Sequence, residues 1–186
     1  MKNQKGTFDD NSYKSSDKVN SLKWDNLNDP VYQDVVNYYA GLIAFRKAHP
    51  ALRMTDAEEV AAHITQLPGL DFNVVACHIS SGANGEENDI VAIFNPRKSE
   101  TAVTLPEGEW TIYVNAQDAG NKALGKAEGE VTVEPISAMV LVKGDWIDPA
   151  LAQEILNANG GTLPVVLGAL TGILVCTYIF NKKRKQ

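Results

Sequence analysis

The chain has 186 residues, 44% hydrophobic and 22% charged, with 14 Gly, 8 Pro and 2 Cys, which excludes a collagen, a disulfide scaffold and a fully disordered chain. It is too short for a complete (β/α)8 barrel, which needs about 250 residues. Residues 1–162 carry a net charge of −10, whereas residues 163–186 carry four basic and no acidic residues. Because the acidic residues 1–162 repel the phosphates of nucleic acids, we expect no nucleic-acid partner.

The first 28 residues are rich in turn formers and poor in apolar side chains, which predicts an irregular segment without the apolar stretch of a signal peptide. A helix is predicted next, because Asp29 suits the N-cap, Pro30 suits the first helical position and Pro50 ends it. Apolar residues recur there at helical spacing, namely Val31, Val35, Tyr38, Leu42 and Phe45. Such a stripe must pack on a partner, which can lie outside this chain.

Residues 55–59 resemble a helix start, with Thr55 and Glu58 spaced as in a capping box. Beyond Gly69 the pattern becomes that of strands, expected at 72–79, 90–95, 110–114, 130–134 and 138–142. Turn formers predict breaks at 81–88, 95–96, 105–108 and 118–120. No helix is predicted between the strands, so the pattern indicates an antiparallel β-sandwich.

The C-terminal region is predicted to be a membrane anchor. Leu163–Phe180 is an uncharged run of 18 residues followed by four consecutive basic residues, which predicts a transmembrane helix at 163–181 and a cytoplasmic basic tail at 182–186. This layout resembles the sorting tails of Gram-positive surface proteins, although Leu163–Leu167 lacks their Thr-Gly cleavage site. A buried helix of a soluble protein is the alternative. We expect a cell-surface protein with the β-domain outside.

The two cysteines and three histidines show no spacing typical of a metal site. The sequence also contains no nucleophile elbow and no phosphate-binding glycine loop. We therefore expect no metal and no cofactor in this chain.

Amides, hydroxyls, carboxylates and two aromatic rings are concentrated in residues 10–24. Rings stack on the apolar faces of sugars, and carboxylates and amides bind their hydroxyl groups. Taken by its composition alone, the segment fits an ordinary polar loop better than a sugar site.

A family resemblance adds to this composition. Asn11-Ser12-Tyr13, Asp17, Val19-Asn20 and Trp24 resemble the loop after the last barrel strands of type I pullulanases. Residues 39–54 are similar to the final barrel helix of that family, and Ile90–Asn95 and 131–142 resemble its C-terminal β-domain. The resemblance extends in order over about residues 8–143.

The resemblance implies part of a debranching enzyme that hydrolyses α-1,6 links in pullulan, starch and branched maltooligosaccharides. In that family the catalytic carboxylates precede this loop, so the missing upstream barrel would supply them. The resemblance assigns glucose binding to Asn11, Tyr13 and Asp17, and Trp24 is expected to anchor the loop.

The expected fold is therefore mainly β with a long N-terminal helix. The expected domains are 1–54 (last loop and helix of the (β/α)8 barrel), 55–144 (β-domain), 145–162 (spacer), 163–181 (transmembrane helix) and 182–186 (tail). Two alternatives stay open, a membrane-anchored carbohydrate-binding module and a purely structural β-sandwich.

Overall fold

The computed structural model describes residues 6–7, 11–150 and 152–153. The chain divides into two units, residues 1–37 and 38–186. The predicted transmembrane helix 163–181 and the tail 182–186 lie outside the described residues. Within the described ranges, no helix has both the length and the apolar character that crossing a membrane requires.

The first unit is built from short helical turns. These are the 3-10 helices η1 (Ser12–Lys14) and η2 (Trp24–Asn28) and the four-residue helix α1 (Asp17–Asn20). None of these three elements contains a buried residue. The polar sequence explains this, because it offers few side chains that could form a core.

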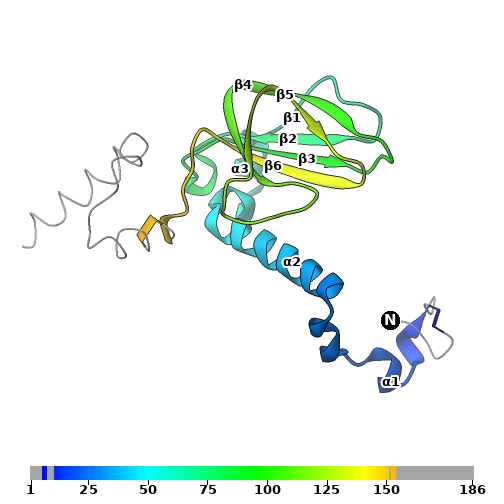
Figure 1. Cartoon of the computed structure of the whole chain (residues 1–186). Helices are drawn as coiled ribbons and strands as arrows, with labels where there is room; N and C mark the ends of the chain where they lie inside the picture. Colours follow the sequence, from blue (N-terminus) through cyan, green and yellow to red (C-terminus); the bar gives the residue numbers. More distant parts are fainter. Residues whose placement is uncertain (1–5, 8–10, 151, 154–186) are drawn as a thin grey trace, which may run out of the picture. The chain divides into compact units, whose positions relative to one another are not determined.

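Helix α2 spans Pro30–Ala48 (Figure 1), the range predicted from the apolar spacing. The Asp29 carboxylate accepts a hydrogen bond from the Val31 N–H at 3.0 Å, as expected of an N-cap. Val31 and Val35 are 70% and 54% exposed, whereas Phe45 is 2% exposed. The C-terminal end of the helix therefore finds a partner within this chain, and its N-terminal part remains uncovered.

After α2 the chain forms the 3-10 helix η3 (Pro50–Arg53) and the helix α3 (Ala57–His63). Asp56 caps α3, accepting hydrogen bonds from the N–H groups of Glu58 and Glu59 at 2.9 Å. The predicted capping box on Thr55 is therefore wrong by one residue. A carboxylate at position 56 satisfies two free N–H groups at once.

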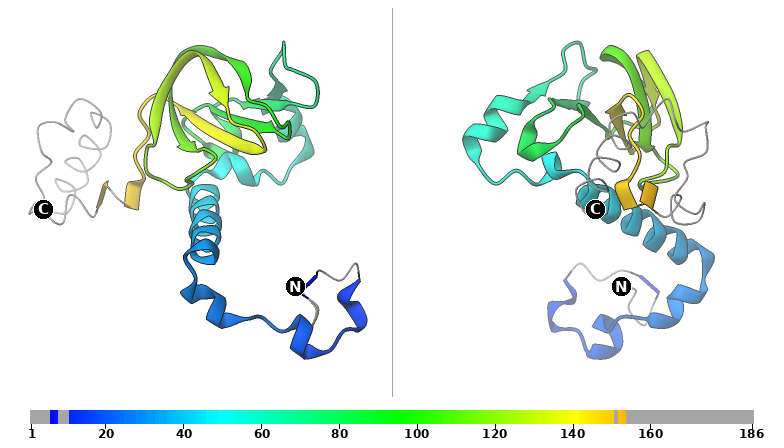
Figure 2. Two further views of the ribbon diagram at one scale, coloured as in Figure 1. Left: turned by 45° about the vertical axis from the view of Figure 1, so that its right-hand side comes forward. Right: turned by 90° about the vertical axis from the view of Figure 1, so that its left-hand side faces the viewer.

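Within the described residues, six strands form one antiparallel sheet, which confirms the antiparallel arrangement expected from the sequence (Figures 1 and 2). They are β1 (Ile64–Gln66), β2 (Val75–Ile79), β3 (Ile90–Asn95), β4 (Thr101–Val114), β5 (Gly125–Val133) and β6 (Ser137–Lys143). Their order in the sheet is β1-β2-β3-β6-β4-β5.

Strand β4 continues through Pro106 and Gly108, where the sequence predicted a break. The register against β5 shifts between Thr104 and Glu109, so the proline and glycine lie in an irregularity and not in a turn. The Pro106 carbonyl accepts a hydrogen bond from the Trp110 indole at 2.8 Å. Strands β4 and β5 curve over the rest of the sheet, as Figure 2 shows.

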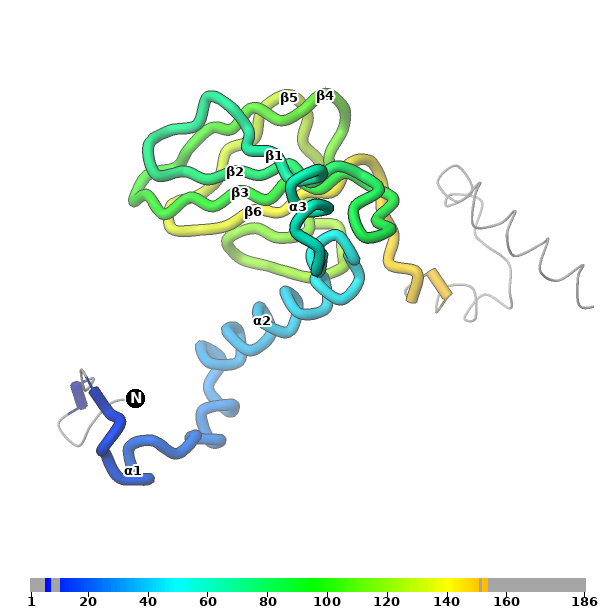
Figure 3. Tube along the Cα trace, turned by 180° about the vertical axis from the view of Figure 1, so that it is seen from behind, coloured from blue at the N-terminus to red at the C-terminus, as the bar shows by residue number. Residues whose placement is uncertain are grey.

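The bend encloses a core between the two halves of the sheet, as in a sandwich. This inner core is formed by Leu67, Val74, Ala76, Val91, Ile93, Val103, Leu105, Trp110, Val131, Val133, Met139 and Leu141. An outer core lies on the opposite face of the sheet, formed by Phe45, Ala51, Ile79, Ala83, Ile90, Tyr113 and Val142. Figure 3 shows the end of α2 meeting this outer face. The continuous apolar runs of β2 and β3 exist because both faces of these strands bury side chains.

Candidate functional site

The loop that carries Asn11, Tyr13 and Asp17 is organised by two amide side chains. The Asn11 side-chain oxygen accepts a hydrogen bond from the Tyr13 N–H at 3.1 Å. The Asn20 amide donates to the carbonyls of Ser12 at 2.8 Å and Ser15 at 3.1 Å. These bonds close the segment into one folded loop with Asn11 at its start.

The rings of this loop point into solvent. Tyr13 is 85% exposed, and Asp17 is exposed in the first turn of α1. Trp24 is 71% exposed and lines a depression of about 220 Å³ with Leu22, Lys23, Asn26 and Leu27. Trp24 is therefore not buried as an anchor within the first unit. Exposed rings and carboxylates of this kind can contact a sugar, although the loop alone forms no enclosed site.

A second candidate surface lies on the outer face of the sheet. Every second residue of β2, β3 and β6 points to this face, and the paired residues form three rows across the strands. Ile79, Ile90 and Val142 form the first row and are buried in the outer core. Cys77, Ala92 and Val140 form the middle row and are half-buried. Val75, Phe94 and Ala138 form the last row. Val75 and Phe94 are 46% and 50% exposed, so an apolar face continues beyond the part that α2 covers.

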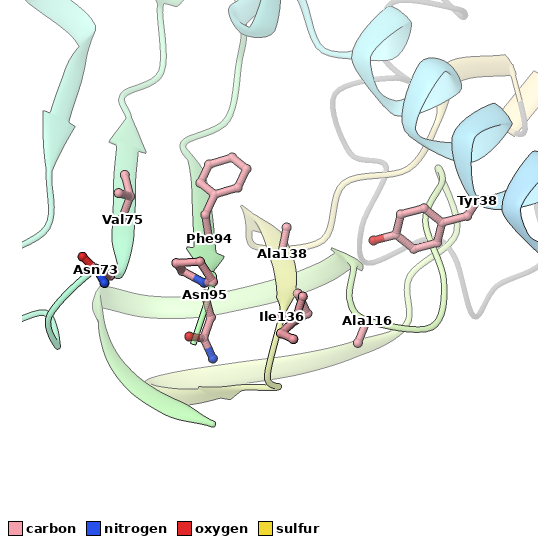
Figure 4. A pocket seen from close by; sticks show the side chains of 10 residues that line it. Tyr38, Asn73, Val75, Phe94, Asn95, Ala116, Ile136 and Ala138 are labelled. Carbon is pink, nitrogen blue, oxygen red and sulfur yellow. The ribbon is translucent and has the colours of Figure 1, made fainter. Parts of the chain in front are cut away.

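This uncovered row borders a pocket of about 520 Å³ (Figure 4). Tyr38 of α2 and Ala116 line it on one side, and Phe94 and Ile136 lie on the sheet side. Ile136 is 71% exposed. The lining is chiefly apolar, which suits a protein surface better than a polar small molecule. We name Val75, Phe94, Ile136 and Ala138 the apolar ridge.

Helix α2 is fixed beside this pocket by two contacts. The Tyr38 hydroxyl donates to the Asn115 carbonyl at 2.8 Å, and burial raises the pKa of Tyr38 above its ordinary value of 10.0. Gly41 lies against Ala119 so closely that a Cβ atom there would stand 1.9 Å from the Ala119 carbonyl oxygen. The pocket wall is therefore positioned by contacts of Tyr38 and Gly41 with the main chain of the 115–120 turn.

The end of α2 is held by a buried polar pair. His49 is fully buried, and its Nδ1 lies 3.1 Å from Glu86 Oε2. The His49 ring packs between Phe45 and Trp146, with ring centroids 4.2 and 4.3 Å away. His63 and His78 contact Ser80 and Asp89 at 2.8 and 3.2 Å. All three histidines thus have structural partners, and no three metal-ligating side chains converge among the described residues.

The sequence patterns missed the residues of the pocket and one exposed ring. Phe72 was predicted to begin a strand, but β2 begins at Val75, and Phe72 lies 86% exposed in the preceding turn. Asn73 adopts a left-handed conformation with φ of 68°. The sequence Asp71-Phe72-Asn73 after Gly69 carries the signal of a turn.

Comparison with known proteins agrees with this fold. Residues 60–118 match the family model described as the all-beta domain of pullulanase. The pullulanase of Bacillus subtilis strain 168 is 42% identical over 98 residues, which are 52% of this chain and 13% of that protein.

Two solved structures have the same fold. The pullulanase of Bacillus acidopullulyticus superposes with a TM-score of 0.67 and 34% identity, over 73% of this chain and 16% of that one. The Group B Streptococcus pullulanase SAP gives a TM-score of 0.61 at 22% identity, over 72% and 20% of the two chains. This chain thus matches about a sixth of the length of these relatives.

The β-rich unit resembles the all-beta domain of pullulanases in sequence and in fold. Taken with the order of its other segments, the chain resembles the C-terminal part of a type I pullulanase.

Proposed function

We propose that this chain acts as the C-terminal portion of a cell-surface enzyme that hydrolyses α-1,6-glucosidic links in pullulan and branched starch. The observation that carries the proposal is the match of 73% of this chain to the B. acidopullulyticus pullulanase, at 34% identity and a TM-score of 0.67. One related structure is described as the B. subtilis type I pullulanase complexed with maltose, and another as an Anoxybacillus pullulanase complexed with maltotriose. These complexes support an α-glucan as the substrate class.

In this proposal α2 is the last helix of a (β/α)8 barrel whose other elements, and whose catalytic carboxylates, are supplied from outside residues 1–186. The uncovered N-terminal part of α2 supports this, since Val31 and Val35 expose an apolar stripe that a barrel would cover. The apolar ridge supports it as well, because a face that is buried at one end and bare at the other suits a second domain.

The loop around Tyr13 would then contribute to glucose subsites. Asn11, Tyr13 and Asp17 project from a loop that is internally hydrogen-bonded, so it can hold its shape at the mouth of a barrel. Tyr13 would stack on a sugar ring, and Asp17 would accept hydrogen bonds from its hydroxyl groups.

We further propose that residues 163–181 anchor the protein in the membrane, with the β-domain outside the cell and the basic tail inside. The uncharged run and the four bases that follow it support this orientation. Fractionation of cells that make residues 145–186 fused to a reporter tests it. Detergent-extractable reporter supports insertion, whereas release only by wall-digesting enzymes contradicts it.

A chimera tests the enzymatic proposal. Residues 11–150 of this chain replace the matching part of the B. acidopullulyticus pullulanase, and release of reducing ends from pullulan is measured. We expect an active chimera in which Tyr13→Ala and Asp17→Asn raise KM at least tenfold, with the exposed Lys14→Ala as the matched control. A folded chimera without activity contradicts the proposal, and unchanged kinetics of both variants remove the loop from the site.

A further inference from the structure

The turn between β1 and β2 presents an aromatic ring that has no role in the core. Phe72 is 86% exposed, whereas Leu67 and Val74 on either side of it are buried in the inner core. The Val74 N–H donates to the Asp71 carbonyl at 3.1 Å, which closes the turn. The ring is therefore held outward by a backbone that is anchored at both ends.

A second turn, residues 96–99, lies beside this ring and is fixed by Asn95. The buried Asn95 amide donates to the carbonyls of Ser99 at 2.9 Å, Val133 at 3.1 Å and Glu134 at 2.9 Å. Its side-chain oxygen accepts from the Arg97 N–H at 3.1 Å. This fully hydrogen-bonded side chain makes the second turn rigid before any ligand arrives.

The two turns form one depression of about 570 Å³, within the range typical of small-ligand sites. Its lining consists of Asp71, Phe72, Asn73, Arg97, Lys98 and Ser99. The Asp71 carboxylate forms an ion pair with Arg97 and accepts a hydrogen bond from the Thr101 hydroxyl at 2.9 Å. Both charged side chains stay partly exposed, so they keep hydrogen-bonding capacity toward a ligand.

We propose that this depression is a surface binding site for an α-glucan chain, separate from the loop around Tyr13. A pyranose ring offers an apolar face for Phe72 and hydroxyl groups for the amide of Asn73 and the paired charges of Asp71 and Arg97. The choice of α-glucan rests on the proposed function. An anion fits less well, because Asp71 already neutralises Arg97, which leaves Lys98 as the other cation of the lining, and because an exposed ring gives an anion no favourable contact.

Isothermal titration of the full chain with maltoheptaose tests the proposal, in a detergent without a sugar headgroup. We expect Phe72→Ala to weaken binding at least tenfold and Phe72→Trp to preserve it. Tyr32→Ala, which removes a 49% exposed ring from α2, is the matched control and should change affinity less than twofold. Inorganic phosphate serves as the competing probe.

The proposal is overturned if the parent chain does not bind maltoheptaose, if Phe72→Ala binds as tightly as the parent, or if phosphate displaces the glucan. In the chimera, Phe72→Ala should raise KM for long branched glucans and leave KM for a short branched oligosaccharide unchanged. An active chimera that is indifferent to Phe72 refutes this site alone. Glucan binding through Phe72 beside an inactive chimera refutes only the enzymatic proposal.

Discussion

Substitution of Gly41 by alanine separates two physical effects that act in opposite directions. Alanine favours a helix over glycine by about 1 kcal/mol, so propensity alone predicts a more stable protein. The new Cβ would stand 1.9 Å from the Ala119 carbonyl oxygen and 2.6 Å from its carbon. Reaching the 3.0 Å below which real Cβ contacts do not occur requires a shift of about 1.1 Å between two backbones.

Overpacking of this kind costs about 1–3 kcal/mol, so we expect Gly41→Ala to lower the free energy of unfolding by up to about 2 kcal/mol after the gain in helix propensity. Urea denaturation followed by near-UV circular dichroism measures the change. Ala44→Gly, at an exposed position one helical turn later, is the control that measures the effect of helix propensity alone. A Gly41→Ala protein that is more stable than the parent would refute the proposed packing of α2 on the 115–120 turn.

Three further results are expected. Burial, with the charge of Asp145 adding to it, raises the pKa of Tyr113 to about 12. The protonated Tyr113 side chain should therefore contribute its full stabilisation below pH 10, and the free energy of unfolding should fall by up to about 2–3 kcal/mol as the pH rises to 12. Tyr113→Phe should flatten that decline in urea denaturation measured over a series of pH values. Asn95→Ala should cost about 2–4 kcal/mol in the same assay, because it leaves buried carbonyls unpaired; a loss below 0.5 kcal/mol would contradict its role. Purified residues 1–160 should release no reducing ends from pullulan, and turnover abolished by Asp17→Asn would disprove this.

The sequence predicts local elements well where the signals are local. Apolar spacing and the flanking Asp29 and Pro50 define α2, and the apolar runs locate β2 and β3 to within a few residues. The bend of β4 could not be predicted, because Pro106 and Gly108 signal a turn and a strand irregularity equally well. Tertiary contact decides between them, since the bend places Trp110 in the inner core.

The candidate sites were less predictable for the same reason. The pocket joins Tyr38 to residues of β3 and β6 that are more than 50 positions away, and no periodicity connects them. Phe72 fits a strand pattern as well as a turn, and only its exposure in the fold separates the two. Asn11, Tyr13 and Asp17 were found by resemblance, and their role in glucose binding stays a prediction.

The central claim is that the apolar ridge and α2 complete a catalytic barrel. It is tested most directly by adding this chain to a B. acidopullulyticus pullulanase that lacks the part matching it, and measuring hydrolysis of pullulan. The account predicts that the parent chain restores reducing-end release and that Phe94→Asp, which places a charge on the 50% exposed ridge position, restores at most a tenth as much. Equal restoration by Phe94→Asp, or none by a folded parent chain, would contradict it.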